Sequence, residues 1–157
     1  MPRLRSIALA ASLLPGLWLA GCSDSTTAPT VESATFASSL GIDLSTYTKT
    51  SSGLYYKDLV VGSGATVANG QTVSVHYTGY FTNGNVFDSN PSTAAPFAFH
   101  LGQSEVIKGW DIGVAGMRVG GQRELIVPPS LGYGSSDYLS IPGNSILVFV
   151  VTVVSAK

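Results

Sequence analysis

The sequence predicts an α+β domain, in which a curved antiparallel β-sheet of about five strands wraps around one short α-helix. Three observations support this fold class. Short segments rich in β-branched and aromatic residues are separated by glycine-containing turns. A single segment repeats apolar residues at helical spacing. The 18 glycines among 157 residues argue against a helical bundle, because each glycine inside a helix costs about 1 kcal/mol relative to alanine.

The clearest strand is expected over residues 72–80, where apolar and polar residues alternate and one face should be buried. Asn69-Gly70 before it and Asn83-Gly84 after it are typical of tight turns. Further strands are expected at residues 54–61, 123–127 and 146–154. The last of these is nearly all β-branched or aromatic and should be a central strand that is covered on both faces.

The one expected helix lies near the middle of the chain. Ile107, Trp110, Val114 and Met117 recur at spacings of three and four, which predicts one apolar face. Glycines in the same segment weaken the helix, so we expect it to be short and held by packing against the sheet.

The first residues are typical of an exported lipoprotein. Arg3 and Arg5 precede a short apolar run, which is less than the ~20 residues that a membrane-spanning helix needs. Leu19-Ala20-Gly21-Cys22 resembles a lipobox, so residues 1–21 are predicted to be a signal peptide and Cys22 to be acylated. The alternative is an ordinary signal peptide, cleaved after an alanine, with Cys22 incidental.

This interpretation predicts a location and a division of the chain. The protein is expected to be exported and lipid-anchored on the periplasmic side of a bacterial membrane, and Ser23 after the cysteine favours the outer membrane. Residues 22–50, rich in Ser, Thr and Ala, are expected to be a flexible tether, and residues 51–157 a folded domain. Cys22 is the only cysteine, so no intramolecular disulfide can form.

The composition and motifs exclude several function classes. The chain is 45% hydrophobic and 11% charged with a net charge of −1, so it offers no basic field for nucleic acid. It contains no nucleophile elbow, phosphate-binding glycine loop or His-Glu-x-x-His motif. His76 and His100 have no further His or Cys at ligand spacing, so neither a metal nor a cofactor is expected.

From about residue 50 onward, a series of motifs resembles the FKBP-type immunophilins, which are peptidyl-prolyl cis/trans isomerases, in order and in spacing. The motifs are Val75-His76-Tyr77-Thr78-Gly79, Val86-Phe87-Asp88-Ser89, Pro96-Phe97-Ala98-Phe99-His100-Leu101-Gly102, Glu105-Val106-Ile107-Lys108-Gly109-Trp110, Gly116-Met117, Val119-Gly120-Gly121, Leu131-Gly132-Tyr133-Gly134 and Leu147-Val148-Phe149.

The resemblance implies an apolar aromatic pocket that accelerates rotation about Xaa-Pro bonds without covalent chemistry. The residues that it implies in catalysis are Asp88, Tyr133, Trp110 and Phe149. Those that it implies in substrate binding are Tyr77, Phe87, Phe97, Val106, Ile107 and Ile141. Trp110 would form the floor of the pocket, and Asp88 and Tyr133 would orient the substrate rather than transfer protons.

One loop departs from the family pattern. Many members have a His or a Gly-Gly-Pro stretch followed by Ile-Pro-Pro, where this chain has Tyr138-Leu139-Ser140 and Ile141-Pro142-Gly143. In the family this loop overhangs the pocket. The expected partners are proline-containing polypeptides, the membrane through the lipid anchor, and macrolide ligands, and the chain is expected to be a monomer. The alternative function is a proline-binding or chaperone module with weak catalysis.

Overall fold

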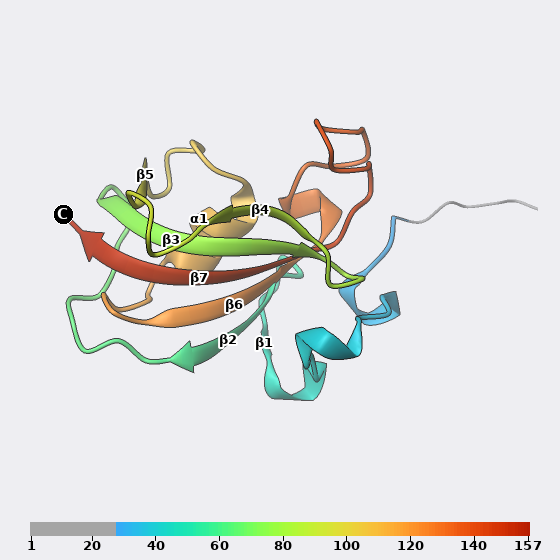
Figure 1. Cartoon of the computed structure of the whole chain (residues 1–157), viewed down its shortest axis with the longest axis horizontal. Helices are drawn as coiled ribbons and strands as arrows, with labels where there is room; N and C mark the ends of the chain where they lie inside the picture. Colours follow the sequence, from blue (N-terminus) through green and yellow to red (C-terminus); the bar gives the residue numbers. More distant parts are fainter. Residues whose placement is uncertain (1–27) are drawn as a thin grey trace, which may run out of the picture.

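The computed structural model describes residues 28–157, which form one antiparallel sheet around a short helix (Figure 1). The strands are β1 (Thr48–Lys49), β2 (Tyr55–Val60), β3 (Thr72–Phe81), β4 (Val86–Asn90), β5 (Phe97–His100), β6 (Gln122–Val127) and β7 (Leu147–Ala156). The helix is α1 (Lys108–Val114), and four 3₁₀ turns are η1 (Val31–Ser33), η2 (Ser38–Leu40), η3 (Leu44–Thr46) and η4 (Pro129–Leu131). The α+β fold class is confirmed.

The sheet has the strand order β1-β2-β6-β7-β3-β4, and β5 pairs with β3 beside this path. All pairs are antiparallel. The sheet has seven strands, whereas about five were expected. The additional strands are short, and β1 and β5 comprise only two and four residues, too few to show alternation.

The strand β7 lies at the centre of the sheet, between β6 and β3, as predicted. Leu147, Val151 and Val153 on its inner face are fully buried. Its outer face is covered only in part, because Val148 is buried whereas Val154 near the end of the strand is exposed. The expectation of cover on both faces therefore holds only for the first half of β7.

Two glycines let α1 lie close against the sheet. A Cβ atom at Gly109 would lie 2.7 Å from a methyl group of Val127, and one at Gly113 would lie 2.6 Å from a methyl group of Leu125. This close packing holds a seven-residue helix that its propensity alone would not support. The helix is shorter than the predicted apolar pattern, because Ile107 is its N-cap and Met117 lies beyond its end.

The segment before the sheet corrects the prediction of a flexible tether over residues 22–50. From Val31 onward it packs on the outer face of the sheet, where Val31 joins a buried cluster with Ile126, Ile146 and Val148. The partly buried apolar residues of the segment that pack on this cluster are Ala34, Phe36, Leu40, Ile42, Leu44 and Tyr47. Apolar side chains spaced among Ser and Thr therefore bury a sheet face that would otherwise contact water.

Polar contacts also hold this segment. The carboxylate of Glu32 accepts a hydrogen bond from the Tyr55 hydroxyl at 2.6 Å and pairs with the ammonium of Lys49. The bonds from Lys49 and Tyr55 lower the pKa of Glu32 to about 2. The hydroxyl of Tyr47 donates to the buried carboxylate of Glu124 on β6.

The predicted signal peptide, residues 1–21, and the predicted acylation site, Cys22, lie outside the described residues. Within residues 28–157, no helix has the length and apolar character needed to cross a membrane.

Candidate active site

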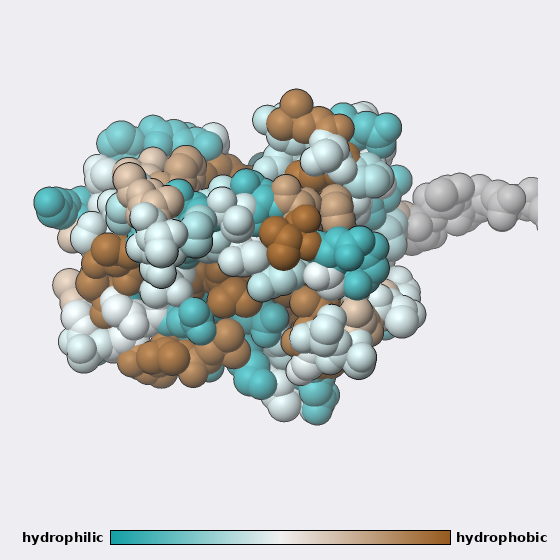
Figure 2. Space-filling view, viewed as in Figure 1, coloured by the Kyte–Doolittle hydropathy of each residue, from teal (hydrophilic) through white to brown (hydrophobic). Residues whose placement is uncertain are grey.

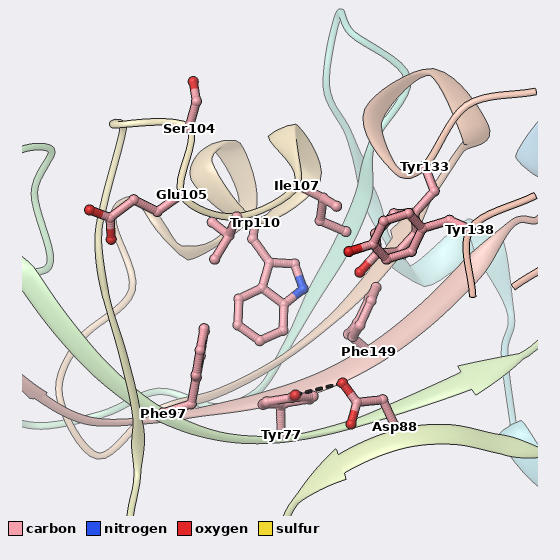
Figure 3. A pocket seen from close by; sticks show the side chains of 11 residues that line it. Tyr77, Asp88, Phe97, Ser104, Glu105, Ile107, Trp110, Tyr133, Tyr138 and Phe149 are labelled. Atoms are coloured by element: carbon pink, nitrogen blue, oxygen red, sulfur yellow. Dashed lines mark hydrogen bonds between the residues drawn. The ribbon is translucent and has the colours of Figure 1, made fainter. Parts of the chain in front are cut away.

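A pocket of about 480 Å³ lies between α1, the sheet and two loops, one before α1 and one before β7 (Figure 3). Aromatic, apolar and a few polar side chains line it: Tyr77, Asp88, Phe97, Ser104, Glu105, Val106, Ile107, Trp110, Tyr133, Tyr138 and Phe149. The strand β3 contributes Tyr77, β4 contributes Asp88, β5 contributes Phe97 and β7 contributes Phe149. The pocket therefore depends on four strands of the sheet rather than on one motif.

Trp110 lies in the first turn of α1 and forms the floor of the pocket. Its side chain is 4% exposed and meets the rings of Tyr77 and Phe149 edge to face, with centroids 5.0 Å and 5.4 Å away. Phe97 approaches it in the same way at 6.3 Å. Such edge-to-face contacts fix the orientation of each ring. The buried indole N–H has no nitrogen or oxygen partner among the described residues.

The rim beside α1 is held by two carboxylates. Asp111 accepts hydrogen bonds from the backbone N–H groups of Gly102 at 2.8 Å and Ser104 at 3.2 Å. Glu105 accepts one from the backbone N–H of His100 at 2.8 Å, and its other oxygen lies 2.7 Å from the His100 ring. These bonds from His100 lower the pKa of Glu105. The rim thus positions Ile107, whose backbone N–H makes no hydrogen bond with any described residue.

Two tyrosines and one aspartate supply the polar groups at the opposite side. The hydroxyl of Tyr77 donates to the Asp88 carboxylate at 2.7 Å (Figure 3). Burial, followed by this hydrogen bond, raises the pKa of Tyr77. The pKa of Tyr133 is raised by burial and, to a smaller extent, by Tyr138 and Asp88. Both tyrosines therefore remain protonated hydrogen-bond donors at neutral pH.

Two of the residues expected to line the pocket do not line it. Phe87 packs behind the wall, with its ring centroid 5.5 Å from that of Phe149, against the backbone of Gly79. A Cβ atom at Gly79 would lie 2.7 Å from the Phe87 ring, so glycine makes room for it. Ile141 is buried and belongs to the core cluster. Both residues support the wall instead of contacting the cavity.

Three residues that sequence reasoning missed, Ser104, Glu105 and Tyr138, line the pocket. Tyr138 stacks on Tyr133, with ring centroids 4.6 Å apart and planes 12° from parallel. The only available sign was that Tyr138 lies where the loop departs from the family pattern. A loop side chain has no periodicity that would reveal its orientation.

The sequence pattern of the family described as FKBP-type peptidyl-prolyl cis-trans isomerase matches residues 64–154. The chain belongs to this family. The match covers β3 to β7 and therefore every strand and both loops that form the FKBP pocket.

Similar proteins agree with this assignment. The chain is 50% identical over 111 residues to FK506-binding protein 4 of Rhizopus delemar. This alignment covers 70% of this chain and 29% of the relative. It is 54% identical over 105 residues to FK506-binding protein 4 of Dictyostelium discoideum, covering 66% of this chain and 28% of the relative. The crystal structure of AtFKBP13 aligns with a TM-score of 0.66 and 36% identity, over 71% of this chain and 98% of that one. The chain thus spans less than a third of the length of these curated FKBP relatives.

The comparisons correct the predicted location. The curated relatives come from fungi and Dictyostelium, which are eukaryotes, and this points away from a bacterial protein with a lipid anchor in the outer membrane. The prediction of an exported, lipid-anchored bacterial FKBP, made from the first residues, is therefore wrong.

Within residues 28–157, no group of His, Cys, Asp and Glu side chains is arranged to hold a metal ion. The chemistry available at the FKBP pocket comes from its aromatic surface and from hydrogen-bond donors at its edges. Asp88 and Glu105 are the carboxylates among the lining residues, and Tyr77 already donates to Asp88.

Proposed function

We propose that this FKBP domain, residues 51–157, accelerates the cis/trans isomerisation of Xaa-Pro bonds in polypeptides. The observation that supports this most strongly is the cavity with Trp110 at its base and aromatic rings from three strands around it. A proline ring is compact and apolar, and such a cavity can enclose it. The reaction needs help, because the barrier of an Xaa-Pro bond is ~18–20 kcal/mol and exchange takes roughly 10–100 s at 25 °C.

The physical basis is a difference in polarity between the ground and transition states. Resonance makes the planar imide polar, and this resonance is lost when the bond twists by a quarter turn. The twisted imide therefore prefers an apolar surrounding more than either planar isomer does. A dry aromatic pocket that fits the twisted form binds the transition state more tightly than the ground state, which lowers the barrier.

The polar groups orient the substrate in this proposal. The backbone N–H of Ile107 and the hydroxyl of Tyr133, both from residues that line the pocket with Trp110, can donate to substrate carbonyl groups. The carboxylate of Asp88, oriented by Tyr77, accepts a backbone N–H from the substrate. None of these groups needs to gain or lose a proton, because rotation about the imide breaks no bond to hydrogen.

The expected partners are unfolded or extended polypeptides that contain proline. The curated relatives are named FK506-binding proteins, and we propose that macrolides of this type compete with peptides for the pocket. The aromatic base of the pocket, rather than the loop whose sequence differs from the family pattern, would bind the apolar ring of such a ligand. We further propose that the chain acts as a monomer.

The test is an isomerisation assay without a coupling protease, in which a proline peptide relaxes from an enriched cis population in the presence of the purified chain. We expect relaxation that is faster than the uncatalysed rate and increases linearly with protein concentration. Relaxation at the uncatalysed rate, combined with measurable binding of the same peptide, would show the alternative function, a binding module. The absence of both would refute the assignment of the pocket.

A further inference from the structure

The loop between η4 and β7 contains a tight turn at the mouth of the pocket. The backbone N–H of Tyr138 donates to the carbonyl of Ile141 at 2.9 Å, and the N–H of Ile141 donates back to the carbonyl of Tyr138 at 2.8 Å. Leu139 lies at the tip of this turn, with its side chain 91% exposed. Figure 2 shows apolar surface at the tip of this loop, above the hollow that separates it from the helix side of the molecule.

The turn is held in one position. The carboxylate of Asp137 accepts a hydrogen bond from the N–H of Gly143 at 2.8 Å, and the N–H of Asn144 donates to the carbonyl of Gly134 at 2.8 Å. A Cβ atom at Gly143 would lie 2.1 Å from the carbonyl oxygen of Ser135, so the two limbs of the loop touch through their backbones. The side chains that the turn presents are therefore pre-organised.

The aromatic stack extends the pocket toward this turn. Tyr138, half of whose side chain is exposed, lies parallel to Tyr133, and both hydroxyl groups point toward the base of the pocket (Figure 3). Phe97 and Glu105 lie at the opposite end of the same view (Figure 3). A polypeptide with its proline over Trp110 would therefore have one flank near Phe97 and the other near the two tyrosines.

Backbone strain also concentrates around the pocket. The non-glycine residues with positive φ in the described chain are Ser104, Leu139 and Asn144, and all three lie in the two loops that flank the pocket. Leu139 has a φ of 51°, an unfavourable conformation for an L-residue with a branched side chain. Its exposed side chain contributes little to the core, so folding does not explain its position. Strained, exposed residues of this kind are concentrated at functional sites.

We propose that Tyr133 and Tyr138, which line the pocket, and the exposed Leu139 next to them in the chain form a second subsite that binds an aromatic side chain of the substrate a few residues away from the proline. This inference rests on the proposed function and adds a substrate class to it: proline segments with a neighbouring Phe, Tyr or Trp. A flat, uncharged ring suits the site, because Tyr138 is half exposed and already stacks on one ring, and Leu139 next to it in the chain is an exposed apolar side chain.

The experiment uses peptides of one length, with the same Leu-Pro pair and with Phe or Ala at each of the four positions on either side of that pair. For the purified chain we expect kcat/KM to be about threefold to tenfold higher for Phe than for Ala at one or two positions on one flank, the range for one stacked aromatic pair. The affinity of each peptide, measured by calorimetry, should show the same preference. The calorimetric arm tests the subsite even if the chain does not accelerate isomerisation.

Three variants locate the preference. Tyr138→Ser should bring the ratio of kcat/KM for the Phe peptide to that for the Ala peptide close to one. Leu139→Gly should reduce the ratio without lowering the melting temperature, because it removes the exposed side chain and the strained φ together. Val61→Ser is the matched control: Val61 is also exposed, directly after the end of β2, but it does not line the pocket, so the ratio should not change.

Two results would overturn the proposal. One is a Phe-to-Ala ratio of kcat/KM that, for the wild-type chain, is the same at every peptide position, or a preference for Phe that persists in Tyr138→Ser. The other is a preference for Arg over Phe at the same positions that disappears at high salt, because the carboxylates of Asp88 and Glu105 would then be selecting the substrate instead of the tyrosine stack.

Discussion

Replacing Trp110 by leucine separates the role of this side chain in the site from its role in the core. Phe99 is the matched control, because it is also buried and its ring centroid lies 5.7 Å from that of Trp110, but it does not line the pocket. If the base of the pocket is catalytic, Trp110→Leu and Phe99→Leu should both lower stability, and only the former should strongly lower activity per folded molecule.

The contacts in the structure set the expected magnitudes. Trp110 has edge-to-face or tilted contacts with four rings, those of Tyr77, Phe97, Phe99 and Phe149. Complete truncation of a buried aromatic side chain costs about 3–5 kcal/mol, and leucine refills part of the space, so we expect a loss of about 2–4 kcal/mol in the free energy of unfolding. Phe99 loses two aromatic contacts and less volume, and Phe99→Leu should cost about 1–2 kcal/mol.

Urea unfolding measures the two stabilities, and the protease-free isomerisation assay measures kcat/KM, corrected for the folded fraction. For Trp110→Leu we expect a decrease of about tenfold or more, equivalent to at least 1.4 kcal/mol of lost transition-state stabilisation. For Phe99→Leu the decrease should be no more than about threefold. Equal decreases in the two variants, or full activity in folded Trp110→Leu, would refute the reasoning.

Three further predictions concern the polar groups and the substrate. Asp88→Val should lower kcat/KM by about tenfold while the urea midpoint changes little, since the carboxylate is exposed; an unfolded variant with normal activity per folded molecule would make Asp88 structural. The lowered pKa of Glu32, about 2 against an ordinary 4.5, means that its contribution to stability is present above pH 4.5 and is lost as the pH falls toward 2. Glu32→Gln should therefore show a smaller shift of the urea midpoint between pH 5 and pH 2 than the wild-type chain, and identical shifts would contradict this. Among peptides that differ only before the proline, Leu and Phe should exceed Glu by about tenfold in kcat/KM, because the charged lining groups, Asp88 and Glu105, are both acidic; a flat profile would contradict this.

The elements that the sequence predicted well are those with strong periodicity. The alternation around Val75 predicted β3, and the apolar spacing around Trp110 predicted α1. The strand β5 was missed because it is only four residues long, and its identity depends on pairing with β3 rather than on its own pattern. The packed segment from Val31 to Tyr47 was mistaken for a tether because its composition is rich in Ser and Thr. Its apolar residues are spaced singly, and only the sheet face that receives them reveals their role.

The candidate site shows the same limit. The resemblance identified residues such as Tyr77, Trp110 and Phe149, and the structure brings them to one cavity. It could not distinguish a residue that lines the cavity from one directly behind it, which is the case for Phe87. Tyr138 was missed because its orientation depends on a turn with reciprocal backbone hydrogen bonds, and no sequence pattern specifies that conformation.

The central claim is that the pocket accelerates rotation by enclosing the twisted imide in an aromatic surrounding, with no proton transfer. The most direct test is the solvent deuterium isotope effect on kcat/KM, measured by the protease-free assay with the wild-type chain. We predict catalysis with a ratio of rates in H₂O and D₂O of about one, and no dependence on pH around neutrality, because Tyr77 and Tyr133 remain protonated there. A ratio of about two or more, with a bell-shaped pH profile, would show that a proton moves in the transition state and would contradict this mechanism.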